Sequence, residues 1–197
     1  LLECKKALEE ARGELAEAEV VLRKRGIASA QRKAGRLTAE GAVGSYVHAG
    51  GKIGVLVEVN CESDFVARTP DFQQLVHELA MHIAAADPRY LRREDVPAEV
   101  REREREIATA KAQAGGKPAH VIERIVEGQL NKFYEENCLL EQHFIKDPNL
   151  SVQQLIAGKI AKLGENIVVR RYSRFKVGEP VSRAQPAAQV VPEPVAR

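Results

Sequence analysis

The chain has 197 residues, of which 44% are hydrophobic and 29% are charged, a composition typical of one globular core with a small accessory unit. Its longest apolar runs are far shorter than the ~20 residues that span a bilayer, so we expect no membrane partner. The net charge of +2 is too balanced for a dedicated nucleic-acid binder, which concentrates basic charge on one face, so no specific nucleic-acid partner is expected.

The first 26 residues predict two short helices, the first stopped by Gly13 and the second by Gly26. Three consecutive basic residues precede Gly26, and cations are favourable in the last turn of a helix. The chain opens on a leucine that already belongs to the helical pattern, so we expect an earlier helix of this small bundle to be missing. Residues 27–38 are basic, small and poorly periodic, and predict a tether that keeps residual helix at most.

From Ala39 onward the pattern changes to strands. Residues 44–48 and 52–60 flank Ala49-Gly50-Gly51, which predicts a hairpin. The second of these strands is apolar on both faces near its middle, so we expect it to be central in a sheet or covered on both sides.

A well-marked helix is predicted to begin at Pro70, with Thr69 as its N-cap, and to end at Asp87-Pro88. Apolar residues at helical spacing define the side that we expect to be buried: Phe72, Leu75, Val76, Leu79, Ala80, Ile83 and Ala84. Two further helices, at 97–114 and from Pro118 through Phe133, are separated by Gly115-Gly116 and predict an antiparallel helical hairpin.

The last part of the folded chain is predicted to hold one more helix and one more strand. Residues 139–146 read as extended, and a turn is expected at Asp147-Pro148-Asn149. A capping box at residues 151–154 opens a helix that ends at Gly164, and a strand follows at 166–177. Together the elements predict an α+β fold, in which an antiparallel three-stranded sheet packs with helices and a helical hairpin.

The three cysteines, Cys4, Cys61 and Cys138, are widely spaced and form no CxxC pair or Cys/His cluster. Such spacing does not fit a zinc site, and we expect neither a metal nor another cofactor. Free thiols of this kind are typical of a reducing compartment, where each cysteine serves as a small apolar residue.

The most informative segment is Val59-Asn60-Cys61-Glu62-Ser63-Asp64-Phe65-Val66-Ala67-Arg68, between the predicted second strand and the helix at Pro70. Asp64 and Phe65 are expected at a strand-to-helix turn, where side chains project from a rigid base toward a partner. An acid next to an exposed aromatic residue is suited to disturbing a site on another protein. The alternative for Phe65 is an aromatic of the core beneath the following helix, and Asp64 alone reads as an acid near a helix start.

This segment resembles the signature of elongation factor Ts, the nucleotide exchange factor of elongation factor Tu, with Ser63 where that family usually has threonine. The resemblance runs from Leu1 to about Gly178. It is carried by several further runs in the same order: 4–8, 22–26, 53–61, 80–85, 139–142 and 164–171.

The resemblance implies a short-form member, as in cyanobacteria, plastids and Thermus. It divides the chain into four parts. Residues 1–26 form a truncated module similar to a ubiquitin-associated bundle, and residues 27–38 form a basic linker. A core and dimerisation domain follows at 39–178, and a disordered Ala/Pro-rich tail at 179–197. The resemblance implies no covalent chemistry, but release of GDP from elongation factor Tu. A homodimer that gives a two-plus-two complex is expected, in a bacterial cytoplasm or, alternatively, in the plastid stroma.

The resemblance also implies roles for individual residues. Phe65 is expected to wedge into the partner near its Mg²⁺ site, Asp64 to perturb that site, and Ser63 to make a local turn or cap hydrogen bond. The full set of expected partner-binding residues is Cys61, Ser63, Asp64, Phe65, Val66, Leu1, Leu2, Lys5 and His82. For Leu1 and Leu2 ordinary packing is the alternative, and for His82 it is a surface histidine without a role.

Two other functions are considered. An enzyme would need a nucleophile and a base, and Cys61 with His48 or His77 is the only candidate set, without an evident third group. A non-catalytic RNA- or ribosome-associated module would use the basic and aromatic residues of the last strand. Alternation along a strand would divide these residues between its two faces, which disfavours that function: Arg170, Arg171, Tyr172, Arg174 and Phe175.

Overall fold

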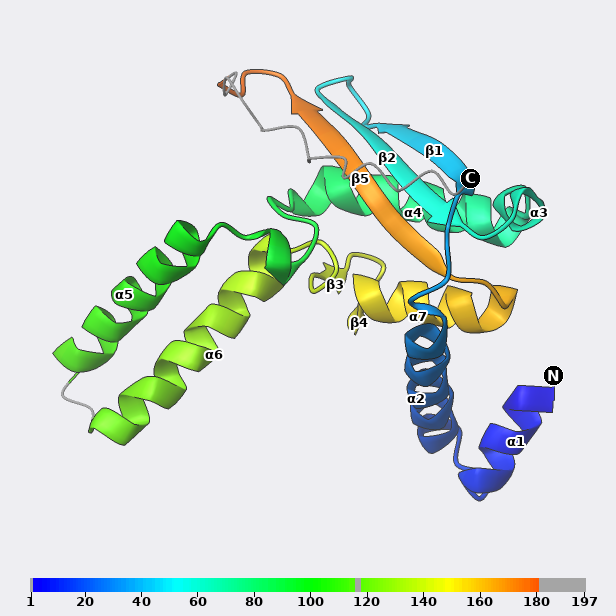
Figure 1. The fold of residues 1–197 in the computed structure, drawn as a ribbon, viewed down its shortest axis with the longest axis horizontal. Coiled ribbons are helices and arrows are strands. Elements are labelled where there is room, and N and C mark those ends of the chain that lie inside the picture. The colour runs from blue at the N-terminus through cyan, green and yellow to red at the C-terminus, as the bar shows by residue number, and fades with distance from the viewer. Residues whose placement is uncertain (1, 116–117, 181–197) are drawn as a thin grey trace, which may run out of the picture.

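The computed structural model describes residues 2–115 and 118–180 and has the predicted α+β architecture (Figure 1). Its main sheet contains β1 (Glu40–Val47), β2 (Ile53–Cys61) and β5 (Ile167–Lys176), all antiparallel, in the order β1-β2-β5. The predicted hairpin is therefore confirmed, and β2 is the central strand. Its turn uses Gly50 and Gly51 at φ 87° and 67°, a backbone conformation that glycine adopts without strain.

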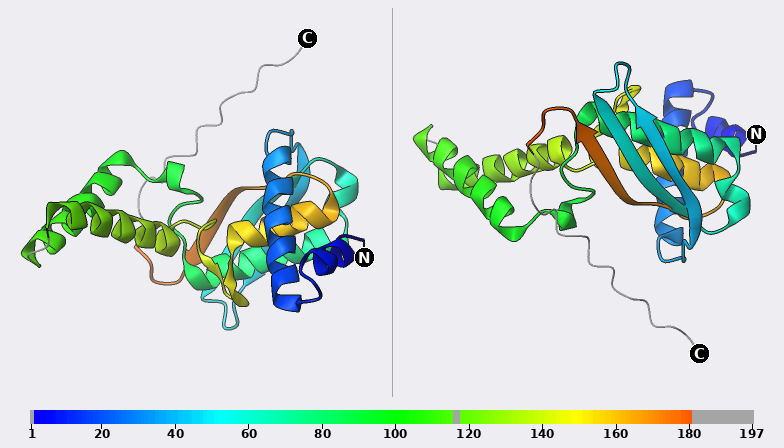
Figure 2. Two further views of the ribbon diagram at one scale, coloured as in Figure 1. Left: turned by 90° about the horizontal axis from the view of Figure 1, so that it is seen from below. Right: turned by 90° about the horizontal axis from the view of Figure 1, so that it is seen from above.

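Helices α4 (Pro70–Ala86) and α7 (Val152–Leu163) cover one face of this sheet. Both N-caps are as predicted, since the Thr69 hydroxyl accepts from the Phe72 N–H and Ser151 forms a capping box with Gln154. All seven residues of the predicted apolar side of α4 are buried in the main core. No helix of the described residues covers the other face of the sheet, which lies in front in the right-hand view of Figure 2.

The N-terminal helices are α1 (Leu2–Glu10) and α2 (Leu15–Lys33). The predicted helix end at Gly26 is wrong, and residues 27–33 of the expected linker are helical. Gly26 is buried where α2 crosses α7, and a Cβ added there would lie 3.6 Å from the Ala157 carbonyl oxygen. At that distance a Cβ would make ordinary van der Waals contact with α7, so α2 packs on α7 here and does not end, and Ala30 further along it packs against the main core.

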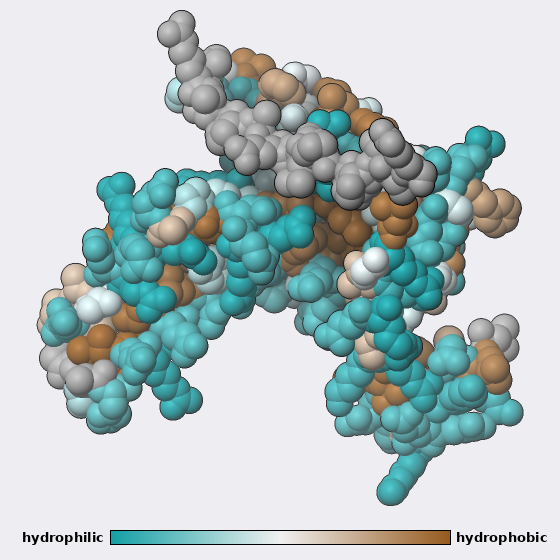
Figure 3. Space-filling model, in the orientation of Figure 1, coloured by the Kyte–Doolittle hydropathy of each residue, from teal (hydrophilic) through white to brown (hydrophobic). Residues whose placement is uncertain are grey.

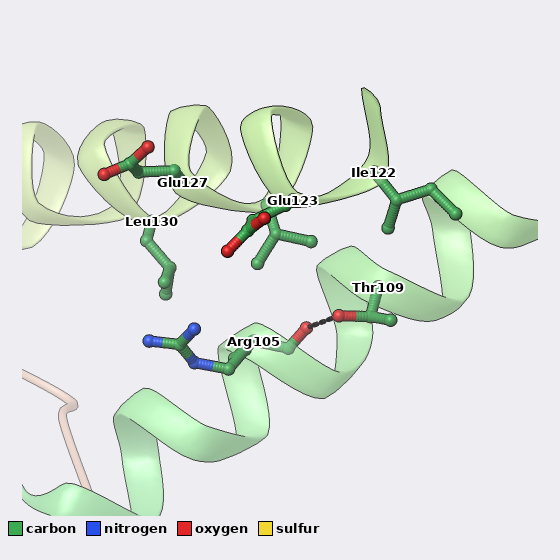
Figure 4. Close-up of a pocket in the computed structure, with 7 residues that line it drawn as sticks. Arg105, Thr109, Ile122, Glu123, Glu127 and Leu130 are labelled. Atoms are coloured by element: carbon green, nitrogen blue, oxygen red, sulfur yellow. Dashed lines mark hydrogen bonds between the residues drawn. The ribbon is translucent and has the colours of Figure 1, made fainter. Parts of the chain in front are cut away.

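Helices α5 (Ala98–Ala114) and α6 (Ala119–Asn137) form the predicted hairpin and project as an arm from the sheet and its helices (Figure 1). The arm has a small core of its own, made by Ala108, Val126 and Leu130. A cleft of about 380 Å³ opens between the two helices, with Arg105, Glu123 and Glu127 among the residues that line it (Figure 4).

A small second sheet joins the arm to the core. It pairs β3 (His143–Phe144) with β4 (Asp147–Ser151), so the expected turn at Asp147-Pro148-Asn149 is wrong. These three residues begin a strand, and the turn lies just before them at residues 145–146. Of the segment 139–146, which was expected to be extended, only 143–144 are in a strand.

An apolar hollow lies under the sheet, where α2, α7 and β5 meet. Its volume is about 480 Å³, and in Figure 3 hydrophobic residues are visible between the arm and α2. Across residues 2–115 and 118–180, no helix is both long and apolar enough to cross a membrane. Within the same ranges no cluster of three or more His, Cys, Asp or Glu side chains is arranged to hold a metal ion. Apart from Glu179 and Pro180, the expected disordered tail lies outside the described residues.

Candidate functional site

The segment with Asp64 and Phe65 forms α3 (Asp64–Ala67), a single turn of helix that follows β2 directly. Ser63 is its N-cap, with extended backbone angles and a hydroxyl that accepts from the Val66 N–H at 3.3 Å. The predicted strand-to-helix turn is confirmed. Helix α3 lies at the end of the sheet opposite the arm (Figure 1).

Phe65 points into solvent with 81% of its surface exposed, whereas Val66 and Ala67 are buried in the main core. Successive helix residues differ by about 100° in direction, so a turn that buries both residue 66 and residue 67 leaves residue 65 about 150° from the middle of the buried side, facing outward. The core alternative for Phe65 is therefore wrong. An aromatic ring held in water loses the roughly 1.5–3 kcal/mol that burial would give, and this free energy remains available to a partner.

Asp64 is also exposed, and its carboxylate forms an ion pair with Arg68 at 2.7 Å, one helical turn further on. Both side chains are open to water, where such a pair contributes little and exchanges readily. The acid is therefore presented together with a cation that can move aside.

The turn before α3 is held by Glu165, which lies between α7 and β5. One oxygen of its carboxylate accepts from the backbone N–H groups of Glu62 and Ser63 at 3.1 and 3.0 Å, and the other accepts from the Ser63 hydroxyl at 2.5 Å. In return, the Glu62 carboxylate accepts from the Asn166 N–H at 2.6 Å. That N–H, and then the guanidinium of Arg36, hold the pKa of Glu62 below its usual value.

Glu165 was missed as a site residue in the sequence analysis, although it lies in one of the matching runs. Its partners are 102 and 103 residues earlier in the chain. The only local signal is that an acid directly follows Gly164, the left-handed residue that ends α7.

Cys61 lies next to the site but is fully buried, and its thiol donates to the Ser63 carbonyl at 3.2 Å. Neither its side chain nor that of Val66, which also faces the core, is presented at the surface here, and the expected partner contacts of both residues stay predictions. Burial, with the negative charge of Glu165, raises the pKa of the Cys61 thiol to about 11, so the thiolate is strongly disfavoured.

The candidate enzyme set is not brought together. Cys61 and His48 lie at opposite ends of the β1–β2 hairpin. Cys61 pairs with Glu40 at one end, and His48 follows Val47, which pairs with Gly54 at the other. Seven strand positions separate Cys61 from Gly54, which corresponds to about 23 Å. The ring of His77 contacts Tyr46, at the same end as His48. Neither histidine can serve Cys61 as a base.

His82 is buried completely, so the alternative of a surface histidine is wrong, and its expected contact with a partner stays a prediction. Its Nδ1 accepts from the Ile145 N–H at 3.4 Å, which assigns the ring hydrogen to Nε2, and Nε2 donates to the Gln142 side-chain oxygen at 3.0 Å. Burial lowers its pKa below the ordinary value. His82 lies outside the apolar side of α4 that faces the main sheet. It is buried because β3 covers it, with Phe144 beside the ring.

The other expected contacts that the structure describes lie in α1. Leu2 and Lys5 are exposed, and Lys5 pairs only loosely with Glu9 at 3.8 Å, while Leu1 lies outside the described residues. Helices α1 and α3 are found at the same end of the molecule in both Figure 1 and Figure 2, away from the arm. One partner can therefore reach both.

The basic and aromatic residues of β5 divide between its two faces, as alternation predicts. The Tyr172 hydroxyl donates to the Pro88 carbonyl at 2.9 Å, and Arg174 is mostly buried and pairs with Asp87. Arg171 and Phe175 point to the open face instead. No continuous RNA-binding surface results from these residues.

Comparison with known proteins identifies the family. A family model described as elongation factor TS matches residues 28–179. A protein of Koribacter versatilis named elongation factor Ts is 64% identical over 91% of this chain and 82% of its own length. Proteins of the same name from Solibacter usitatus and Geobacter sulfurreducens are 62% and 60% identical, over 91% and 94% of this chain and 84% and 86% of their own lengths. The chain therefore belongs to the elongation factor Ts family, whose members act in the elongation stage of protein synthesis.

Proposed function

We propose that this protein is a guanine-nucleotide exchange factor for elongation factor Tu, with Phe65 and Asp64 as the residues that act on the partner. The observation that supports the proposal most is the exposure of Phe65 on a turn whose backbone is fixed to the core. The protein performs no covalent chemistry in this proposal. Its place of action is the bacterial cytoplasm, in keeping with its bacterial relatives.

The mechanism follows from thermodynamic linkage. A translational GTPase holds GDP through a phosphate loop, a helix N-terminus and Mg²⁺. A protein that binds better to the distorted, Mg²⁺-free state weakens nucleotide binding by the same coupling free energy. Tenfold weakening requires about 1.4 kcal/mol. Burial of the Phe65 ring only in the distorted state supplies about 1.5–3 kcal/mol, enough for roughly ten- to hundredfold weakening.

Asp64 and α1 have supporting roles in this proposal. The Asp64 carboxylate, once released from Arg68, adds negative charge beside the Mg²⁺ site and disfavours the arrangement that holds GDP. Leu2 and Lys5 on α1 add a second contact to the same partner, so that Phe65 is presented in one orientation.

The test is release of fluorescent GDP from elongation factor Tu in the presence of excess unlabelled nucleotide. We expect release to be accelerated at least tenfold at a saturating concentration of this protein. Binding without acceleration would contradict the exchange function and leave only a docking role. Absence of binding would contradict the assignment of the partner.

We further propose that two copies of the chain associate through the open face of the sheet, so that a two-plus-two complex forms with the partner. This face presents apolar side chains on all three strands: Val43, Val47, Leu56 and Phe175. Exposed apolar groups that adjoin one another in this way are typical of an interaction surface.

Leu56→Lys should convert the dimer to a monomer in sedimentation equilibrium. Because a two-fold interface contains each residue twice, the dissociation constant should rise by at least about a hundredfold. Ile107→Lys, an exposed position on α5, is the control and should leave the dimer intact. A wild-type protein that remains a monomer at tens of micromolar would contradict the proposal.

A further inference from the structure

Among the described side chains, only the carboxylate of Glu165 accepts from the backbone N–H groups immediately before α3. It accepts three hydrogen bonds there, from two backbone N–H groups and the Ser63 hydroxyl, and none of the three comes from Asp64 or Phe65 themselves. Hydrogen bonds to an ionised acceptor are about twice as strong as neutral ones. Glu165 therefore ties the turn between α7 and β5 to the start of α3.

Helix α3 depends on such support because it has only four residues. A single turn cannot form alone, since fixing its backbone costs more than its one or two internal hydrogen bonds return. Its end is held by Gln73 and Thr69, whose side chains donate to the Ala67 and Val66 carbonyls at 2.7 and 2.8 Å. Its start is held by the Ser63 cap.

The Ser63 hydroxyl connects Glu165 to the helix. It donates its hydrogen to the Glu165 carboxylate at 2.5 Å and accepts from the Val66 N–H at 3.3 Å. A hydroxyl has one hydrogen. When that hydrogen is donated to the Glu165 carboxylate, the oxygen lone pairs are free to face the helix. The negative charge also lies near the helix N-terminus, where it is favourable. Any residue with a hydroxyl at position 63 can serve in this way, as serine does here.

We propose that Glu165 is a positioning residue for nucleotide exchange: it fixes the Ser63 cap and thereby the direction in which Phe65 projects. This inference rests on the proposed exchange function. Because 81% of the Phe65 surface is exposed among the described residues, little packing orients the ring, and the backbone of α3 sets the direction in which the side chain leaves the helix. Loss of the Glu165 carboxylate should leave Phe65 present and exposed, but variable in direction.

The first experiment measures that direction without any partner. The chain has no tryptophan, so Phe65→Trp introduces a unique fluorophore at the site. We expect Glu165→Ala to increase the fast, large-amplitude part of the anisotropy decay of this introduced tryptophan. Glu165→Gln, whose amide oxygen still accepts from the backbone N–H groups, should restore most of the order. The control is Glu78→Ala, which removes another largely buried carboxylate bonded to Lys146, and should leave the decay unchanged.

The second experiment is a double-mutant cycle on GDP release. We expect Glu165→Ala to lower the maximal release rate roughly tenfold, a coupling of about 1.4 kcal/mol, with a smaller change in the half-saturating concentration. In a Phe65→Ala background the same substitution should have almost no further effect, because nothing is left to position. Glu165→Gln should recover much of the rate and keeps the test informative if the alanine variant fails to fold.

Two results would overturn the inference. One is an additive cycle, in which Glu165→Ala slows release equally with and without the Phe65 ring, as expected of a residue that merely stabilises the fold. The other is an anisotropy decay of the introduced tryptophan that Glu165→Ala leaves unchanged. If instead elongation factor Tu releases GDP as fast with the Phe65→Ala variant as with the wild type, the proposed wedge itself is wrong. The anisotropy measurement then still decides whether Glu165 orders the turn.

Discussion

Replacement of Phe65 by alanine is expected to slow GDP release from elongation factor Tu about ten- to a hundredfold relative to the wild-type exchange factor. The reason is that the substitution removes the roughly 1.5–3 kcal/mol that ring burial contributes in the partner's distorted state. The fold should be unaffected, because an exposed side chain away from caps and cores changes the free energy of unfolding by about 0.5 kcal/mol at most.

The decisive measurement is stopped-flow release of fluorescent GDP over a range of exchange-factor concentrations. Ile107→Ala removes a partly exposed apolar side chain on the arm and should leave the rate unchanged. Phe65→Leu retains apolar bulk and should lie between wild type and alanine. A folded Phe65→Ala protein with wild-type rates would show that the ring is not the group that acts, and would direct attention to Asp64.

Features that depend on local chemistry could be predicted from the sequence. The N-caps Thr69 and Ser151 and the glycines of the β1–β2 turn act through their nearest neighbours in the chain, and the structure has each of them in place. The position of Asp64 and Phe65 at a strand-to-helix turn could also be predicted from local sequence. A polar cap residue close after an apolar strand marks where α3 starts, although the turn also needs the support of distant residues.

Features that depend on distant segments could not be predicted. Gly26 has the local properties of a helix end, but α2 continues through it because the helix packs on α7, about 130 residues later. Glu165 supports a turn more than 100 residues before it, and neither residue signals the other in the sequence. His82 has the spacing of an exposed residue on α4 and is buried where Phe144 of β3 and the turn after it pack on that side.

The burial of His82 leads to the second large expected effect. His82→Leu should lower the free energy of unfolding by about 2–3 kcal/mol, because the Gln142 oxygen and the Ile145 N–H lose their partner in a buried site. For a chain of this length that change corresponds to a fall of about 4–12 °C in the melting temperature. Calorimetry measures it, with His48→Leu at an exposed position as the control.

The damage should extend beyond the histidine itself, because Gln142 also donates to the Glu136 carbonyl at 2.9 Å near the end of α6. The double substitution of His82 and Gln142 by leucine should therefore cost less than the sum of the two single changes. At a temperature where His82→Leu remains folded, GDP release should equal that of the wild type. Slower release with unchanged stability would instead indicate that His82 reaches the partner, as the sequence alone suggested.

The pH dependence of stability provides an independent check on the same residue. Burial lowers the pKa of His82 in the folded protein below the value of 6.5 expected when it is unfolded. Between these two values the unfolded chain binds a proton that the folded protein does not, so the free energy of unfolding falls as the pH falls below about 6.5. His82→Leu removes this contribution. The stability difference between wild type and variant should therefore be largest above pH 6.5 and shrink in acid, and a difference that stays constant would contradict a neutral, buried histidine.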